Sequence, residues 1–176
     1  GIVPFALGTD TAGSGRVPAA LNNIVGLKPS LGAISTTGLV PVCRSLDCIS
    51  VFELTVEDAW TAARAMAAYD ADDAFSRPVA FERQGLPPKL RVGVPDARSL
   101  EFFGDAIAAA AFQRSLAALA DFDASCKSVD LAPFHEVARL LYSGPWVGER
   151  YAAIRPIIEA NDSVLHPVTL QIIAGA

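Results

Sequence analysis

Short apolar runs separated by polar turns fill the first 56 residues, a pattern typical of strands in a sheet core. Residues 2–7 form an apolar run that ends at Gly8 and is expected to be a buried strand. Residues 8–15 predict a tight polar turn, and a short helix is expected to follow. The further elements expected in this part are a helix over 18–22 and extended segments over 24–27, 33–35 and 50–54.

From residue 55 onward, apolar positions recur mostly with helical spacing. Thr55-Val-Glu-Asp58 resembles a capping box and begins a helix that should bury Ala59, Ala63 and Met66. A second apolar stripe, of Phe112, Leu116 and Leu119, predicts another helix. The elements expected here are helices over 55–69, 105–120, 133–141 and 145–160, with strands over 91–94 and 128–131. Strands that alternate with helices predict the α/β class.

Composition limits the possible partners. The 176 residues are 52% hydrophobic and 19% charged, with 14 basic and 19 acidic side chains and a net charge of −5. The chain is therefore too apolar to be disordered, and too acidic for a sequence-independent grip on nucleic acid or anionic lipid. No apolar run approaches the roughly 18 residues of a membrane span. We expect no nucleic-acid partner and no membrane partner.

Cysteine and histidine are sparse. Three cysteines and two histidines lack the spacing of a zinc site, so no metal and no other cofactor is expected. The odd number of cysteines argues against a disulfide framework and favours a reducing cytoplasm. Cys43 and Cys48 are interpreted as packed core thiols.

Charges and glycines are unevenly distributed along the chain. Residues 1–56 contain six charged side chains but seven of the 13 glycines, which predicts a sheet core there and a helical portion over 57–176. An exposed excursion is expected near 70–89, where acidic and Gly-Leu-Pro-Pro segments gather. The chain starts without Met and stops within an apolar helical pattern, so we expect it to be the central part of a larger domain.

The segment with the clearest chemistry is Gly8-Thr-Asp-Thr-Ala-Gly-Ser-Gly-Arg16. Its glycines allow close approach of a substrate to the backbone, and successive N–H groups in such a turn can converge on an anion. A serine within the turn, Ser14, could attack a carbonyl while its own loop supplies the oxyanion donors. The alternative is a structural turn in which Ser14 caps a helix.

Spacing excludes four other motifs. A P-loop needs Lys followed by Ser or Thr after its second glycine, whereas Gly13 precedes Ser14-Gly15. A nucleophile elbow needs glycine two residues on each side of the serine, and the dinucleotide fingerprint needs glycines at other intervals. An aspartic protease needs a second carboxylate turn besides Asp10, and none is present.

Three ordered motifs resemble the amidase signature family: the Gly8–Ala20 segment, Gly26-Leu-Lys-Pro-Ser30 and Ser45-Leu-Asp47. The resemblance implies an α/β amidase-signature fold with a mixed β-sheet core flanked by helices. It identifies Ser14 as the nucleophile, with the N–H groups of Thr11, Ala12, Gly13 and Ser14 forming the oxyanion hole. Gly15, where many members carry a larger residue, suggests an unusual acyl pocket. Asp10 and Arg16 are expected to stabilise the loop.

A closer similarity is to allophanate hydrolases, carried by residues 22–52 and by Tyr142-Ser-Gly-Pro-Trp-Val-Gly-Glu-Arg-Tyr151. It implies hydrolysis of allophanate, an N-carboxyurea, through a serine acyl-enzyme in urea or triazine-type nitrogen use. Arg150 would hold the carboxylate of this small anionic substrate and Tyr142 would add a hydrogen bond. Arg139 and Arg155 stay open as substitutes for Arg150. A homodimeric full-length enzyme is also implied.

The same resemblance indicates missing chemistry. The family activates its nucleophile through a lysine base and a bridging serine that lie upstream of it. This chain has three lysines: Lys28 belongs to a turn with an apparent structural role, while Lys89 and Lys127 read as exposed. We therefore expect the polypeptide to be inactive alone. A general amidase, a non-catalytic scaffold and a Ser14–His135 pair remain as alternatives.

Overall fold

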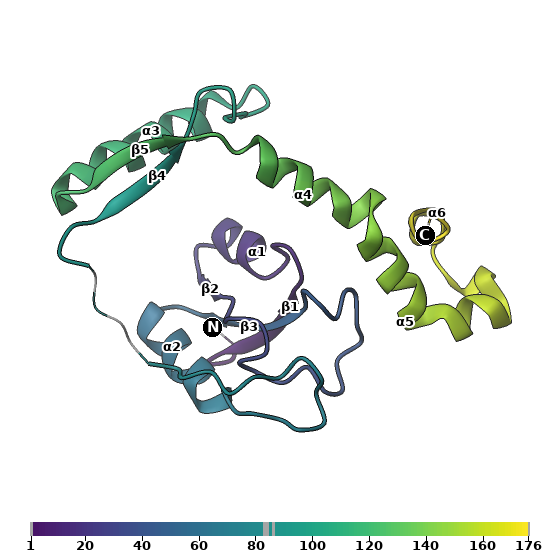
Figure 1. Cartoon of the computed structure of the whole chain (residues 1–176). Coiled ribbons are helices and arrows are strands. Elements are labelled where there is room, and N and C mark those ends of the chain that lie inside the picture. Colours follow the sequence, from purple (N-terminus) through teal and green to yellow (C-terminus); the bar gives the residue numbers. More distant parts are fainter. Residues whose placement is uncertain (1, 83–84, 86, 176) are drawn as a thin grey trace. The chain divides into compact units, whose positions relative to one another are not determined.

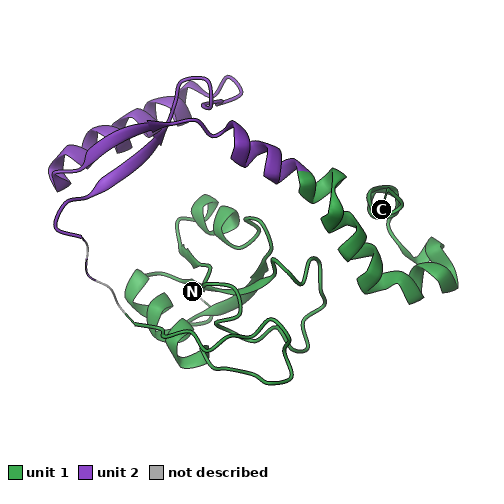
Figure 2. Cartoon of the chain, in the orientation of Figure 1, with its two compact units in different colours: residues 1–82, 140–176 green, residues 83–139 purple. Residues whose placement is uncertain are grey.

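The computed structural model describes residues 2–82, 85 and 87–175. It divides into two compact units, shown in Figure 2. Unit 1 comprises Gly1–Glu82 and Leu140–Ala176, and unit 2 comprises Arg83–Arg139. Both ends of the sequence therefore contribute to unit 1.

Unit 1 is built on a three-stranded antiparallel sheet with the strand order β1-β3-β2 (Figure 1). The strands are β1 (Ala6–Asp10), β2 (Val25–Leu27) and β3 (Cys48–Glu53). In β1, Ala6 pairs with Phe52 and Asp10 pairs with Cys48. Asp10 therefore lies at the end of the sheet from which the glycine-rich loop departs.

Small side chains let the helices of unit 1 pack closely on this sheet. Helix α1 (Arg16–Leu21) contacts β2 through the buried Ala19, and α2 (Val56–Met66) contacts β2 and β3 through Ala59 and Ala63. The Thr55 hydroxyl accepts a hydrogen bond from the Asp58 amide, which confirms the predicted cap of α2. The C-terminal elements of unit 1 are α5 (Pro145–Asn161), η2 (Asp162–Val164) and α6 (Pro167–Ile173).

The predicted first strand is displaced by several residues. Residues 2–5 are outside β1, and Ile2 and Val3 are exposed. Pro4 lacks an amide donor for a sheet ladder, so the strand begins at Ala6. Residues 8–10, expected in the turn, belong to β1 instead, because Gly8 pairs with Ser50.

Two other expectations concern loops. Residues 33–35, expected to be extended, form a bend in which the Ala33 amide donates to Ser30 O, so that prediction is wrong. Asp70 and Asp73 hold this region by accepting hydrogen bonds from the hydroxyls of residues 35–37. Within the predicted excursion over 70–89, the described residues are exposed or half-buried, while 83–84 and 86 lie outside the described residues.

Unit 2 contains a pair of parallel strands, β4 (Arg91–Pro95) and β5 (Ser125–Val129). Strand β5 begins three residues before the predicted one, because Ser125 already pairs with Arg91. Between them lie α3 (Ala106–Ala118) and η1 (Leu119–Phe122), and the Asp105 carboxylate caps α3. The apolar stripe predicted here, of Phe112, Leu116 and Leu119, is half-buried. Helix α4 (Ala132–Ser143) starts in unit 2 and ends in unit 1.

Candidate active site

A short loop of residues 11–15 connects β1 to α1 and carries Ser14. The Ser14 side chain is exposed, and its hydroxyl donates a hydrogen bond of 3.1 Å to the carbonyl of Thr9. Gly13 has a φ of 149°, which a residue with a side chain adopts only with strain. The amide N–H groups of Ala12, Gly13 and Ser14 donate to no other backbone group among the described residues. They are therefore available to an oxyanion.

The other two glycines of the segment serve packing, not backbone freedom. A Cβ on Gly8 would lie 2.6 Å from the Phe52 ring, and one on Gly15 would lie 3.1 Å from side-chain atoms of Asp10 and Ser50. Gly15 is buried and is absent from the lining of the adjoining cavity. The suggestion that Gly15 indicates an unusual acyl pocket stays a prediction.

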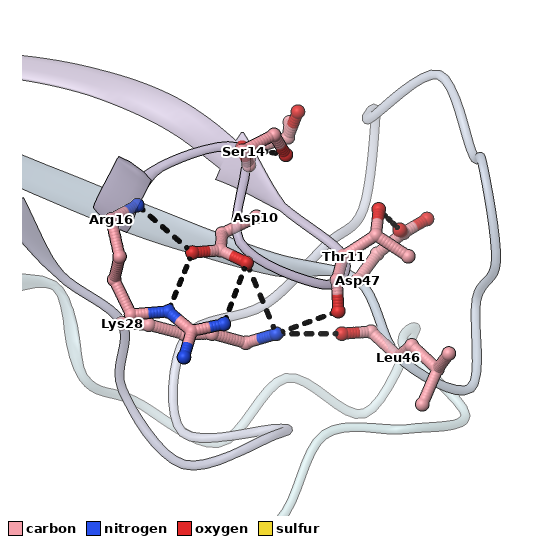
Figure 3. A network of polar contacts seen from close by, with 8 residues as sticks. Asp10, Thr11, Ser14, Arg16, Lys28, Leu46 and Asp47 are labelled. Atoms are coloured by element: carbon pink, nitrogen blue, oxygen red, sulfur yellow. Dashed lines mark hydrogen bonds and ion pairs between the residues drawn. The ribbon is translucent and has the colours of Figure 1, made fainter. Parts of the chain in front are cut away.

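A fully buried carboxylate holds the base of the loop (Figure 3). Asp10 accepts hydrogen bonds from the Arg16 amide at 3.2 Å, from Arg16 Nε at 2.9 Å and from Arg16 Nη2 at 3.2 Å. Lys28 Nζ approaches the same carboxylate at 3.4 Å and donates to the carbonyl of Thr11 at 2.9 Å. These contacts confirm that Asp10 and Arg16 stabilise the loop, and they give Lys28 a structural role.

Opposing effects set the ionisation of this cluster. Burial by itself would raise the pKa of Asp10, but the hydrogen bonds from Arg16 and the charges of Lys28 and Arg16 outweigh it. The pKa of Asp10 therefore lies well below its usual range. The same hydrogen bonds raise the pKa of Arg16. Asp10 is thus a permanent anion that holds two cations under the loop.

A second buried carboxylate, Asp47, was part of a sequence motif but had no predicted role. Asp47 Oδ1 accepts a hydrogen bond of 2.6 Å from the Thr11 hydroxyl, and Oδ2 accepts from the amides of Val42 and Cys43 at 2.9 and 3.0 Å. The sequence contained one signal for such a role. Residues 1–56 hold few charges, and an acidic residue buried in an apolar segment needs hydrogen-bond donors from the protein. Asp47 therefore connects the Ser14 loop to residues 42–43.

A cavity of about 580 Å³ adjoins Ser14 within unit 1. It brings together all six predicted site residues, although they lie up to 139 positions apart in the sequence. Its other lining residues are largely apolar. The lining consists of Thr9, Thr11, Ala12, Gly13, Ser14, Val17, Pro18, Val42, Leu141, Tyr142 and Arg150.

Arg150 is the charged residue among those that line the cavity. Its guanidinium carbon lies 5.5 Å from the centre of the Tyr142 ring, a cation–π distance. Its Nε atom is buried and has no hydrogen-bond partner in the described part of the chain. The predicted substitute Arg155 instead pairs with Glu159 at 2.7 Å on the surface. Arg150 is therefore a cation at the cavity whose Nε has no hydrogen-bond partner among the described residues.

The described residues place no lysine at the cavity. Lys28 is engaged by Asp10 and Thr11, and Lys89 and Lys127 are exposed, as predicted. His135 lies on the part of α4 that belongs to unit 2, so its pairing with Ser14 stays a prediction. Cys43 and Cys48 are buried, as expected, and burial raises the pKa of both thiols.

Two properties of the described residues bear on partners. Over residues 2–82, 85 and 87–175, no helix is both long and apolar enough to cross a membrane. Within the same residues, His, Cys, Asp and Glu side chains form no group of three that could hold a metal ion.

Comparison with known proteins identifies the family. The sequence profile named Amidase matches residues 1–171. The chain belongs to the amidase family. This confirms the resemblance drawn from the three motifs and the expected α/β amidase fold.

Individual relatives of this amidase chain are longer than the chain itself. Urea amidolyase of Saccharomyces cerevisiae is 42% identical over 180 residues, which cover the whole chain and 10% of the relative. The structure of selenomethionine-substituted Kluyveromyces lactis allophanate hydrolase is 43% identical with a TM-score of 0.89, covering 100% of this chain and 29% of that one. The glutamyl-tRNA(Gln) amidotransferase protein of Heliobacterium modesticaldum is 44% identical over 106 residues, or 57% of this chain and 21% of the relative. The chain thus spans less than a third of each.

Proposed function

We propose that this amidase chain carries the nucleophile and the substrate-binding arginine of an enzyme that hydrolyses the amide bond of allophanate. The observation that carries the proposal is the cavity in which the Ser14 loop meets Arg150, a partly buried cation whose Nε has no hydrogen-bond partner among the described residues. Likeness to urea amidolyase and allophanate hydrolase over the whole chain supports the same substrate.

The proposed chemistry is acyl transfer to serine. Ser14 Oγ attacks the terminal carbonyl carbon of allophanate, and the amide N–H groups of Thr11, Ala12, Gly13 and Ser14 stabilise the resulting oxyanion. The bond from that carbon to the terminal nitrogen breaks, and the nitrogen takes up a proton and leaves as ammonia. Water then cleaves the acyl-enzyme ester, and the released N-carboxycarbamate breaks down to carbon dioxide and further ammonia.

Arg150 and Tyr142 would select the substrate. A guanidinium can bind a carboxylate through two parallel hydrogen bonds, either from its two Nη atoms or from Nε and one Nη. The Nε of Arg150 has no hydrogen-bond partner among the described residues. The Tyr142 ring lies 5.5 Å from the guanidinium carbon and Tyr142 lines the cavity, so we propose that its hydroxyl adds a hydrogen bond to the substrate. Because the carboxylates Asp10, Asp47 and Glu149 are absent from the cavity lining, an anionic ligand meets no like charge there.

The base that activates Ser14 would come from outside the described residues, since these place no lysine at the cavity. We therefore expect the 176-residue polypeptide to be inactive by itself. By the same reasoning we propose that residues 1–56 and 57–176 form the central part of an amidase domain. The enzyme containing it is expected to be a cytoplasmic homodimer that needs no cofactor.

A general amidase is the second candidate. The amidotransferase relative is about as identical to this chain where it aligns, but it aligns to 57% of the chain. A neutral amide has no carboxylate for the Arg150 guanidinium to bind. The third candidate, a non-catalytic scaffold, predicts no nucleophile at Ser14.

The test uses the full-length enzyme that contains this chain and compares its variants on two substrates. The ammonia released from each substrate is measured. We expect Ser14→Ala to abolish hydrolysis of both allophanate and the neutral amide biuret. Arg150→Ala should raise the KM for allophanate by about a hundredfold, the loss of one charge-assisted bidentate contact, and should leave the KM for biuret within about threefold. Equal losses on both substrates would favour the general amidase, and an active Ser14→Ala protein would refute the nucleophile.

A further inference from the structure

Residues 42–47 form a loop that is bonded to both sides of the cavity. At one end, Asp47 accepts the hydrogen bond of 2.6 Å from Thr11 on the nucleophile loop. Two residues earlier, Ser45 donates to Glu149, the neighbour of Arg150 on α5. The nucleophile loop and the arginine are therefore connected through three residues of one short loop.

The Ser45–Glu149 contact uses both oxygens of the carboxylate. The Ser45 amide donates to Oε1 at 2.8 Å, and the Ser45 hydroxyl donates to Oε2 at 2.7 Å. Glu149 is half-buried and is absent from the residues that line the cavity. A carboxylate occupied in this way fixes a helix to a loop and has no oxygen left for a substrate.

The Ser45–Glu149 contact lies near the start of α5. Gly144, at the N-cap of α5, makes no side-chain capping hydrogen bond. Loop 42–47 also approaches α5 through the Cys43 thiol, which lies 3.7 Å from the carbonyl of Trp146 and interacts with the Arg150 side chain. Glu149 thus supplies the strong, charge-assisted part of the attachment.

We propose that Glu149 is a positioning residue for Arg150. Its hydrogen bonds to Ser45 fix the first two turns of α5, and with them the guanidinium, at the distance from Ser14 that allophanate requires. The inference rests on the proposed function, because it takes Arg150 as the residue that binds the anionic end of the substrate.

Removal of the Glu149 carboxylate should weaken the binding of allophanate by displacing Arg150. Glu149→Ala leaves the Ser45 amide and hydroxyl without their acceptors and frees the start of α5. A misplacement of about 1 Å in a binding group can cost up to about a hundredfold in rate. Because Arg150 contacts the substrate before and during reaction, the loss should appear mainly as a KM for allophanate raised about tenfold or more, with kcat changed less.

The experiment is a double-mutant cycle in the full-length enzyme that contains this chain, with allophanate as substrate. Glu149→Ala, Arg150→Ala and the double variant are compared, and we expect the double variant to be no worse than Arg150→Ala within about threefold. Glu149→Gln should restore most of the activity, because its amide keeps an acceptor for Ser45 and the serine hydroxyl can turn to accept. Glu159→Ala is the matched control, a carboxylate on the same helix that pairs with Arg155 on the surface.

The outcomes separate this inference from the proposed function. Multiplying losses in the double variant, or a Glu149→Ala enzyme indistinguishable from Glu159→Ala, would overturn the positioning role while Arg150 keeps its own. An Arg150→Ala enzyme with unchanged KM would refute the substrate assignment and the positioning role with it. If Glu149→Ala fails to fold, Ser45→Ala removes the 2.7 Å bond alone, and a KM that does not rise in that variant overturns the inference.

Discussion

Substitution of the buried Asp10 by Asn should destabilise unit 1 strongly. The change removes the charge at nearly constant volume and replaces one accepting oxygen by a donating amide. Three donors from Arg16 and one from Lys28 then face a group that can accept only part of their hydrogen bonds. Breaking a buried ion pair from one side typically costs about 3–5 kcal/mol, because the partner charge stays uncompensated.

The solvent exposure of Arg16 and Lys28 decides where in this range of free energies the Asp10→Asn variant should fall. The Arg16 side chain is 51% exposed and can regain water, whereas the Lys28 side chain is 19% exposed and cannot do so fully. We therefore expect about 3 kcal/mol, the lower end of the range. With a urea dependence of about 1–3 kcal/mol per molar, the unfolding midpoint should fall by about 1–3 M.

Urea denaturation followed by tryptophan fluorescence measures this, since Trp60 and Trp146 both lie in unit 1. Glu159→Gln is the control: it removes an ion pair of 2.7 Å whose side chains are 62% and 53% exposed, which should cost less than about 0.5 kcal/mol. Similar small shifts for the two variants would refute the reasoning.

Acid provides a second check on Asp10. Its pKa is lower in the folded than in the unfolded chain, so its contribution is complete above the unfolded value of about 3.9 and is lost as the pH falls toward the folded value. The stability difference between wild type and Asp10→Asn should therefore narrow below about pH 4. A difference that stays constant down to about pH 2.5 would show that the charge of Asp10 is not its cause.

Three further predictions test packing, thiols and capping. Gly15→Ala should lower the free energy of unfolding by about 1–3 kcal/mol, measured by urea denaturation, because its Cβ would lie 3.1 Å from Ser50; an unchanged midpoint would show that the loop yields. The folded 176-residue chain should titrate one thiol with a disulfide reagent, the exposed Cys126, and three after denaturation, because the other two thiols are buried; rapid titration of Cys43 would contradict this. Thr55→Ala should cost about 1 kcal/mol in the same denaturation assay through the lost cap of α2, and Thr55→Ser should restore it.

Periodicity predicted the helices better than the strands. Helix α2 carries its own signals, a capping threonine and two alanines on one face, and these lie within the segment that folds. The limits of β1 depend instead on its partner. Gly8 reads as a turn residue, but it belongs to β1 because Ser50 pairs with it and the Phe52 ring occupies the space of a side chain. Such long-range pairing leaves no local mark in the sequence.

The candidate site likewise combines features with local sequence signals and features that depend on long-range contacts. The Ser14 loop is local, so its glycines and its flanking Asp10 and Arg16 could be interpreted directly from the sequence. The contacts of Asp47 with Thr11 and of Glu149 with Ser45 could not, because the residues of each pair lie 36 and 104 positions apart. An acidic residue that binds a backbone amide has the same sequence appearance as one on a solvated surface.

The contacts of the carboxylates Asp10, Asp47 and Glu149 explain how a chain of net negative charge could hold the proposed anion site. Net charge acts at a distance and is screened within about 8–10 Å at physiological salt, so the groups that line a cavity determine what binds there. Asp10 is neutralised by two cations, and Asp47 and Glu149 direct their oxygens to amide and hydroxyl donors. Arg150 retains a buried Nε with no partner among the described residues. A substitution that placed a carboxylate on this lining, such as Val42→Asp, should therefore weaken binding of allophanate far more than one added surface charge on the chain.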